Sequence, residues 1–129
     1  MQKLPPDTAV IVIDHGSRMQ AANDMLDEVV AMYRAATGVA VVEAAHMELA
    51  SPTLEEAVGR CLEAGARTIV VHPYFLAPGR HSTGDIPGMV AALAPLHPEV
   101  RFRVTNPLGV DPAIAPIMHR RVAEALGTL

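Results

Sequence analysis

The chain alternates short apolar runs with amphipathic helical periods, and this alternation constrains the fold more than any other feature. Runs rich in β-branched residues lie at 8–13, 39–45, 68–73 and 100–105. After each run, apolar residues recur every three or four positions, as on one face of a helix. This order predicts a parallel sheet with right-handed crossovers. We therefore expect an α/β fold: a single four-stranded, mostly parallel sheet flanked by helices on both faces.

Capping residues predict where the first two helices begin and end. The first carries an apolar stripe over 22–33 and should stop at Gly38, because glycine is favoured just after a helix. Ser51 as the cap and Pro52 as the first helical residue should start the second helix. Gly65 should end it.

The second half of the chain predicts two more helices and an edge strand. Asp85 should begin and cap the third helix. The run at 100–105 contains some polar alternation, so we expect it at an edge of the sheet. The last helix should span 113–126 and turn five apolar residues inward: Ile114, Ile117, Met118, Val122 and Leu126.

Size and composition are typical of one compact domain. The 129 residues suit a single domain over 1–129, with 1–8 as a polar lead-in. Half of the residues are hydrophobic but only 3% are aromatic, so the core should consist of aliphatic side chains. Cys61 is the single cysteine, which excludes an intrachain disulfide and a metal site built from several cysteines. We expect Cys61 in the core.

Charge and hydropathy exclude two classes of partner. The net charge is −4 and no basic stripe is present, so nucleic-acid binding is not expected. No apolar run approaches the roughly 20 residues that span a bilayer, and the N-terminus has no signal-peptide pattern. We expect a cytoplasmic protein that does not enter a membrane.

Polar residues cluster where the predicted strands end, which is where open α/β sheets bind ligands. His15 and His81 follow different strands, each in a glycine-containing turn. Two neutral imidazoles can bind Fe²⁺, Co²⁺, Ni²⁺ or Zn²⁺. Glu48, after the second strand, can supply an oxygen ligand or a base. A histidine at a strand end is more often structural than a ligand, so both interpretations stay open from these residues alone.

Neighbouring polar residues have alternative roles. His46 is a candidate hydrogen-bond donor beside the site, whereas His72 is more consistent with a structural role. Asp14 can orient His15 or cap the following helix.

Several familiar sites are missing from the sequence. There is no GxxxxGK[ST] phosphate loop, no GxGxxG after the first strand and no GxSxG elbow. Ser17 lies near His15 but lacks an orienting partner, which disfavours a hydrolase. A phosphoacceptor receiver domain needs clustered acids after its first strand and an aspartate after its third. This chain has Asp14 alone and then Tyr74-Phe75 at those places.

Four segments resemble the small sirohydrochlorin chelatases, the short form of the class II chelatases. They are IVIDHGSR (11–18), VVEAAHMELASPTL (41–54), PYFLAPGRH (73–81) and DIP (85–87). The similarity covers about residues 9–126 in the same order and includes PLG followed by Asp111-Pro112. The family contains ferrochelatases of siroheme synthesis and cobaltochelatases of cobalamin synthesis. The AHMELASP form looks more like the iron enzymes, but these residues do not decide the metal.

The resemblance implies a role for individual residues. His15 matches a metal ligand and proton acceptor, His81 matches the second metal ligand, and Glu48 lies near the site as a further catalytic candidate. Residue type and resemblance together predict a substrate-binding surface, which comprises Ser17, Arg18, Ser51, Leu76, Ala77, Pro78, Gly79, Arg80, Ser82 and Thr83.

The resemblance also implies an activity and an assembly. We expect a lyase-type enzyme that inserts Fe²⁺ or Co²⁺ into sirohydrochlorin without ATP. Ni²⁺ is a further candidate for the metal substrate. No permanently bound cofactor is expected. A homodimer with the tetrapyrrole between its subunits is implied, since larger chelatases resemble two such halves in one chain. The alternative is a non-catalytic metal or tetrapyrrole carrier, which would keep the same two histidines.

Overall fold

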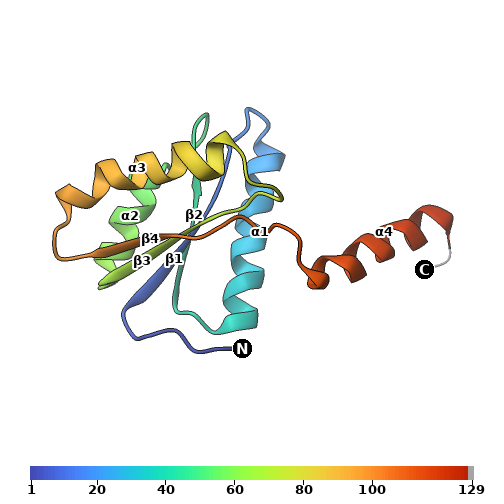
Figure 1. Cartoon of the computed structure of the whole chain (residues 1–129), viewed down its shortest axis with the longest axis horizontal. Helices are drawn as coiled ribbons and strands as arrows, with labels where there is room; N and C mark the ends of the chain where they lie inside the picture. Colours follow the sequence, from blue (N-terminus) through green and yellow to red (C-terminus); the bar gives the residue numbers. More distant parts are fainter. Residues whose placement is uncertain (128–129) are drawn as a thin grey trace.

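One parallel sheet forms the centre of the protein, as the sequence predicts. The computed structural model describes residues 1–127. The strands β1 (Thr8–Asp14), β2 (Val41–His46), β3 (Thr68–Pro73) and β4 (Arg101–Val104) lie in the order β2-β1-β3-β4, all parallel (Figure 1). The helices are α1 (Gln20–Thr37), α2 (Leu54–Glu63), α3 (Ile86–Leu93) and α4 (Ala115–Leu126). Three short helical turns lie between them: η1 (His81–Asp85), η2 (Ala94–Leu96) and η3 (Pro112–Ile114).

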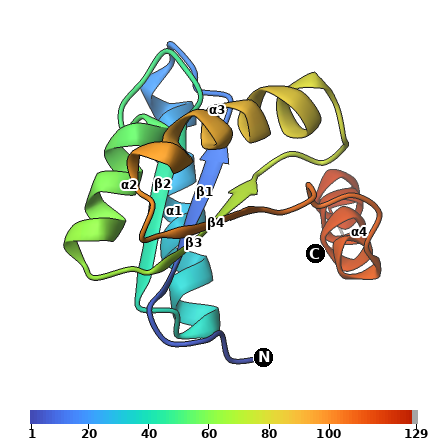
Figure 2. The same cartoon turned by 60° about the vertical axis from the view of Figure 1, so that its left-hand side comes forward.

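The two faces of the sheet are covered differently. Helices α2 and α3 lie side by side on one face, and α1 lies on the other (Figures 1 and 2). Under α2 and α3, the buried core includes Ile11, Ile69 and Leu54. Under α1 a smaller cluster forms around Val12 and Leu26. Both faces of the sheet are apolar, because the central strands are continuous apolar runs; only the edge strand β4 alternates with polar residues.

Cys61 lies in the larger core, as predicted, with none of its surface exposed. Burial raises the pKa of the Cys61 thiol to about 12. The thiol is therefore protonated at neutral pH and behaves as a small hydrophobic group.

The prediction for the start of α2 is wrong in detail. The cap is Thr53, whose hydroxyl accepts a hydrogen bond from Glu56 N–H while the Glu56 carboxylate accepts one from Thr53 N–H. Hydrogen bonds to its carboxylate lower the pKa of Glu56, and the bond from the Thr53 backbone N–H has the largest effect. The Ser51-Pro52 bond is cis, and the Pro52 carbonyl accepts from His46 N–H in an extended segment. Pro52 therefore precedes the helix, and the Ser51 hydroxyl donates to Glu56.

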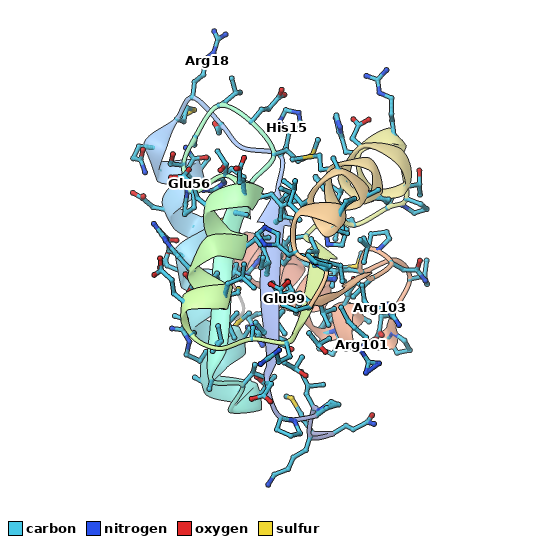
Figure 3. All side chains as sticks on the ribbon, turned by 90° about the vertical axis from the view of Figure 1, so that its left-hand side faces the viewer. His15, Arg18, Glu56, Glu99, Arg101 and Arg103 are labelled. Carbon is cyan, nitrogen blue, oxygen red and sulfur yellow. The ribbon has the colours of Figure 1, made fainter. Side chains whose placement is uncertain are left out.

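Other boundaries agree with the sequence within a few residues. Gly38 ends α1 in the left-handed conformation, with φ of 73°. Strand β4 is an edge strand whose Arg101 and Arg103 side chains are exposed, while Phe102 is half-buried (Figure 3). Within residues 1–127, no helix is long and apolar enough to cross a bilayer.

The predicted packing of the last helix is wrong. Helix α4 projects away from the sheet in both views (Figures 1 and 2). Its apolar residues are exposed, at 47% for Ile117, 63% for Met118 and 72% for Leu126. An amphipathic pattern shows that a face needs covering but does not show which surface covers it. Here the connection from β4 directs the helix outward.

Candidate metal-handling site

Three residues that are far apart in the sequence meet at the carboxyl ends of the strands. His15 follows β1, Glu48 follows β2, and His81 begins η1. The His15 Nε2 atom lies 3.1 Å from Glu48 Oε1. The His15 and His81 ring centroids are 4.8 Å apart, with planes at 65°. All three side chains are partly exposed, so they form an open mouth at this rim of the sheet (Figure 3 shows His15).

Gly16 lets the first two loops come together. Its φ is 92°, and a Cβ built on it would lie 1.8 Å from the Glu48 carbonyl oxygen. Backbone hydrogen bonds continue the sheet beyond its strands here: Met47 N–H donates to the Asp14 carbonyl, and Glu48 N–H donates to that of His15. Only glycine fits both the conformation and the space. The backbone therefore fixes His15 beside Glu48.

Asn23 holds the same turn from below, and sequence reasoning missed it. Its side-chain carbonyl accepts from Ser17 N–H at 2.9 Å, and its amide donates to the Ser17 carbonyl at 2.8 Å. Asn23 is only 5% exposed. The available signal was a polar residue on the buried row of α1 that contains Leu26 and Val30. The Ser17 hydroxyl accepts from Met19 N–H, so it also stabilises the turn.

Both ring nitrogens of His15 face oxygen atoms. Nδ1 lies 3.1 Å from the Gly16 carbonyl oxygen, and Nε2 lies 3.1 Å from Glu48 Oε1. Both of these oxygens can only accept, so the carbonyl and the carboxylate both make the surroundings of the ring electron-rich. The arrangement is therefore suited to a cation.

Asp85 orients His81 and does not cap α3 as predicted. Asp85 Oδ2 lies 2.8 Å from His81 Nδ1, which places the proton on Nδ1 and leaves Nε2 as an acceptor. The π-helical η1 runs directly into α3 with helical backbone at Asp85, so no N-cap position exists there. The Phe75 ring stacks on His81, with centroids 6.3 Å apart.

Asp14 serves a different histidine from the one expected. It neither orients His15 nor caps a helix; Asp14 Oδ1 lies 2.5 Å from Nδ1 of His46, which is 2% exposed. His46 lies beneath the turn, since its Cβ is 3.2 Å from the position a Cβ on Gly16 would take. His72 bonds the Thr105 hydroxyl, and burial lowers the pKa of His72. Both contacts are those of structural histidines.

The expected substrate loop is exposed, but two of its hydroxyls are used within the loop itself. Leu76 to Arg80 lie at the surface, and Leu76 is 69% exposed. Ser82 is buried and accepts from Gly79 N–H, while the Thr83 hydroxyl donates to the Gly79 carbonyl. These two residues shape the turn that precedes His81. Arg18 projects away from the body (Figure 3).

Two exposed apolar residues that follow the site residues in the chain were also missed: Met19 comes after the His15 turn, and Leu49 comes directly after Glu48. Met19 is 70% exposed and Leu49 is 55% exposed, the latter with a φ of 70°. Nothing in the periodicity marks them, because both lie in loops. Among the described residues, no group of three or more His, Cys, Asp or Glu side chains is arranged to enclose a metal ion. The mouth therefore offers two imidazoles and a carboxylate in an open arrangement, which does not surround an ion.

The fold is that of an open, parallel α/β protein, with two histidines and a carboxylate on the loops at the carboxyl ends of its strands. The CbiX family model matches residues 9–125, and the chain belongs to this family. The chain is 40% identical over 117 residues to the chloroplastic sirohydrochlorin ferrochelatase of Arabidopsis thaliana, covering 91% of this chain and 52% of that protein. It is 32% identical to the sirohydrochlorin cobaltochelatase of Methanopyrus kandleri, covering 92% and 97% respectively.

Solved structures share the fold. A putative cobalamin biosynthesis CbiX protein from Marinobacter aquaeolei has a TM-score of 0.80 and 29% identity, covering 95% of this chain and 99% of that one. The sirohydrochlorin chelatase SirB from Bacillus subtilis subspecies spizizenii, in complex with cobalt, has a TM-score of 0.85 and 28% identity. That match covers 91% of this chain but 50% of SirB, so the chain spans about half the length of this relative and of the plant one.

Proposed function

We propose that the protein inserts a divalent metal ion, Fe²⁺ or Co²⁺, into sirohydrochlorin without ATP. The observation that carries the proposal is the meeting of His15, Glu48 and His81 at one open mouth. Such a site can hold an ion by few ligands and release it to a stronger chelator. A closed four-ligand site would retain the ion.

The named relatives support the same activity. They include a sirohydrochlorin ferrochelatase and a sirohydrochlorin cobaltochelatase. SirB structures contain cobalt in one case and Fe³⁺ in another. The plant relative, at 40% identity, is named for iron, which makes Fe²⁺ the first metal to test.

In the proposed reaction the two imidazoles receive the metal. With the proton on Nδ1, where the Gly16 carbonyl faces His15 and Asp85 faces His81, each Nε2 presents a lone pair to the metal, that of His15 beside the Glu48 carboxylate. The Glu48 carboxylate balances part of the charge beside His15. The metal here is a substrate: it enters hydrated and leaves in the macrocycle.

Insertion also releases two protons from the ring nitrogens of the tetrapyrrole. A nitrogen that holds the metal cannot accept a proton at the same time, so ligand exchange precedes proton transfer. When the ion moves to the ring nitrogens, the vacated Nε2 of His15 and the Glu48 carboxylate can accept the protons. The balance is one M²⁺ taken up and two H⁺ passed to the protein and then to water.

The surroundings of the mouth fit a flat, polyanionic substrate. Leu76, Leu49 and Met19 offer exposed apolar surface on the segments that carry the three site residues. Arg18 and Arg80 are exposed on the loops either side of the mouth, where they can approach peripheral carboxylates. We include Ala77, Pro78 and Gly79 in the proposed contact surface, and Ser51 and Thr83 at its margin. Ser17 and Ser82 support the loops.

Removing either histidine tests the proposal. His15→Ala and His81→Ala should each reduce the insertion rate by roughly 100-fold or more, because each removes a metal ligand. Insertion is followed by the change in the absorption spectrum of sirohydrochlorin under anaerobic conditions, with Fe²⁺, Co²⁺ and Ni²⁺ in parallel. His119→Ala is the matched control, since His119 is an exposed histidine on α4. Normal rates in both site variants would refute the assignment.

A non-catalytic carrier is the second candidate, favoured only by the openness of the site. A carrier would deliver one equivalent of metal or tetrapyrrole and then stop. Assays with excess sirohydrochlorin and metal distinguish the two, because an enzyme makes many equivalents of product per chain. A product yield that never exceeds one equivalent would support the carrier.

We further propose that the active form is a cytoplasmic homodimer with the tetrapyrrole held between subunits. Two copies of this chain have about the length of SirB, which the chain matches over half. Light scattering on active protein should give a mass twice the 13.7 kDa of one chain. A mass of one chain in active protein would refute the dimer.

A further inference from the structure

The last residues of the neighbouring strands β1 and β2 form a buried polar pair. Asp14 and His46 lie opposite each other in the parallel register. Asp14 Oδ1 is 2.5 Å from His46 Nδ1, and because a carboxylate can only accept, the imidazole Nδ1–H donates this hydrogen bond. The His46 side chain is 2% exposed and that of Asp14 is 22% exposed. The imidazole of His46 therefore lies beneath the mouth, and the proposed insertion reaction uses neither residue.

Each member of the pair leads directly into a loop that carries a site residue. His15 follows Asp14 at once, and Glu48 comes two residues after His46. Backbone hydrogen bonds join the two loops just beyond the pair. Met47 N–H donates to the Asp14 carbonyl at 2.9 Å, and Glu48 N–H donates to the His15 carbonyl at 3.1 Å. The pair thus lies at the root of both loops, where a shift of one strand end against the other would separate His15 from Glu48.

His46 also closes the base of the second loop. Its backbone N–H donates to the Pro52 carbonyl at 2.8 Å, and His46 forms a parallel β-bridge with Thr53. Glu48 is exposed on the loop between these points. His46 therefore ties the end of β1 to both ends of the loop that carries Glu48.

Packing alone does not require a polar pair at this place. The preceding residues of the two strands, Ile13 and Ala45, are apolar and fully buried. Replacing buried ionic pairs by apolar residues of similar size is often neutral or stabilising. A charge-assisted hydrogen bond, by contrast, fixes both the distance and the direction between its partners. The pair is therefore suited to setting how the two strand ends lie relative to each other.

We propose that Asp14 and His46 are a positioning pair that fixes the separation of His15 and Glu48 and thereby sets the affinity of the mouth for the metal substrate. The side-chain hydrogen bond keeps the strand ends in register, and the backbone bonds beyond it carry that register into the two loops. His15 Nε2 is held 3.1 Å from Glu48 Oε1 as a result. The inference rests on the proposed function, since it concerns the metal that the mouth receives.

Removing the side-chain hydrogen bond tests the role of the pair. His46→Leu and Asp14→Ala should each weaken Co²⁺ binding roughly tenfold, because residues behind metal ligands affect metal affinity by about this factor or more. His46→Asn can keep an N–H donor near the position of Nδ1, so it should recover part of the affinity. Co²⁺ is titrated into the 129-residue chain and followed by the absorption of the bound ion, with circular dichroism to verify folding.

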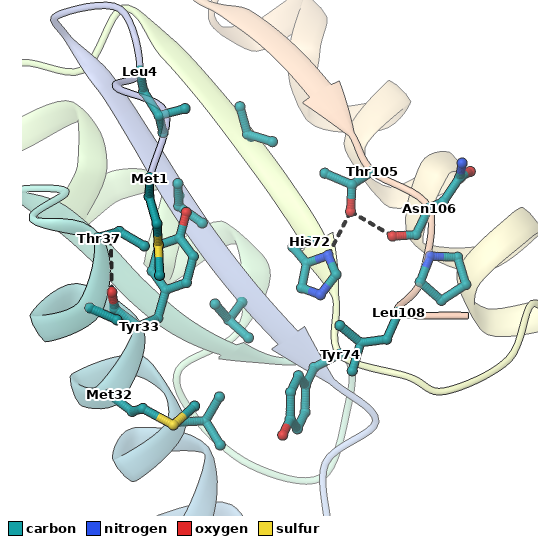
Figure 4. Close-up of a pocket in the computed structure, with 16 residues that line it drawn as sticks. Met1, Leu4, Met32, Tyr33, Thr37, His72, Tyr74, Thr105, Asn106 and Leu108 are labelled. Carbon is teal, nitrogen blue, oxygen red and sulfur yellow. Dashed lines mark hydrogen bonds between the residues drawn. The ribbon is translucent and has the colours of Figure 1, made fainter. Parts of the chain in front are cut away.

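His72→Leu is the matched control. His72 also lies near the carboxyl end of a strand and makes a side-chain hydrogen bond, to the Thr105 hydroxyl at 2.6 Å. That bond lies beside an apolar pocket on the α1 face of the sheet and joins neither of the loops that carry His15 and Glu48 (Figure 4). The control should lose stability without any change in Co²⁺ affinity.

A double-mutant cycle separates positioning from a general loss of structure. Glu48→Ala removes the carboxylate that the pair is proposed to position, so His46→Leu should have little further effect on Co²⁺ binding in a Glu48→Ala chain. A general defect would weaken binding by the same factor in both chains. In the insertion assay, His46→Leu should raise the KM for Co²⁺ and leave the KM for sirohydrochlorin unchanged.

Each result supports or refutes the pair. Weaker Co²⁺ binding that His46→Asn partly recovers, and that disappears in the Glu48→Ala chain, supports it. Native affinity in folded His46→Leu or folded Asp14→Ala refutes it. Failure of both variants to fold also refutes it, because the pair would then be a requirement of the whole fold. A native chain that binds Co²⁺ without turnover refutes the chelatase proposal and leaves the pair to be decided by the titrations, whereas a native chain that binds no Co²⁺ refutes both.

Discussion

The rim that carries His15 and His81 and the core directly beneath it are built on the same strands but are held by different interactions. In the core, Ile11 and Ile69 are fully buried and held by apolar packing. At the rim, side chains are partly exposed and are fixed by backbone hydrogen bonds, one glycine and buried polar partners such as Asn23. The difference teaches that stability and chemistry here depend on separate sets of residues, and it can be tested one residue at a time.

The largest effect on stability is expected in the core. Ile11→Ala should lower the free energy of unfolding by about 2–5 kcal/mol, because it removes buried methyl groups and leaves a cavity. The change is measured by urea denaturation monitored by circular dichroism. Leu76→Ala, at an exposed position, serves as the control and should change stability by less than about 0.5 kcal/mol. Similar losses in the two variants would break the comparison.

Gly16 is the rim residue whose substitution is expected to lower stability about as much as a substitution in the core. Gly16→Ala should lower the free energy of unfolding by about 3 kcal/mol, since the new Cβ meets the Glu48 carbonyl and φ is positive. Displacement of the loop should also slow metal insertion, because His15 and Glu48 separate. Gly79→Ala is the matched control, as a Cβ there meets nothing within 4 Å and no positive φ is found. Equal stability of the two variants would show that the close approach is unimportant.

Asp85 is the rim residue expected to affect activity without affecting stability, because it acts through His81. Asp85→Asn should reduce the insertion rate roughly tenfold with almost no loss of stability, because the amide no longer fixes the Nδ1–H tautomer. The reduction should appear as weaker binding of Co²⁺ in a titration, and Asp85→Glu should recover part of it. Loss of stability without weaker metal binding would instead indicate a purely structural role.

The smallest effect is a pH dependence from His72. Burial lowers the pKa of this histidine in the folded protein, so the unfolded chain binds a proton that the folded chain resists. Stability should therefore be fully present above the unfolded pKa of about 6.5 and should decline as pH falls below it. The fall in melting temperature between neutral and mildly acidic pH should be smaller in His72→Gln than in the native chain. An equal fall in both would exclude His72 as the source.

Much of this arrangement follows from the sequence, for identifiable reasons. The strands could be predicted because fully buried parallel strands are continuous apolar runs, and their carboxyl ends located His15, Glu48 and His81 on one rim. The direction of α4 could not be predicted, because it depends on backbone hydrogen bonds of Leu108 and Gly109 that no side-chain pattern encodes.

Hydrogen-bond partners were the other limit. From the sequence, Asp14 and Asp85 could each accept hydrogen bonds from several different donors. Only the fold shows that Asp14 pairs with His46 and Asp85 with His81. The cap of α2 lies at Thr53 and not at Ser51 because the Pro52 carbonyl accepts from His46 N–H and Thr53 forms a β-bridge with His46 before the helix begins. In each case a long-range contact overrode a sound local preference.

The two hydrogen bonds from Leu108 and Gly109 to Phe75 and Leu76 join the root of α4 to the loop beside His81. A displacement of the helix therefore reaches the surface on which a macrocycle would rest through ordered backbone. A change in what α4 contacts, such as separation of the proposed subunits on dilution, would then alter that surface as well. Specific activity per chain would become a function of protein concentration, even at saturating substrate.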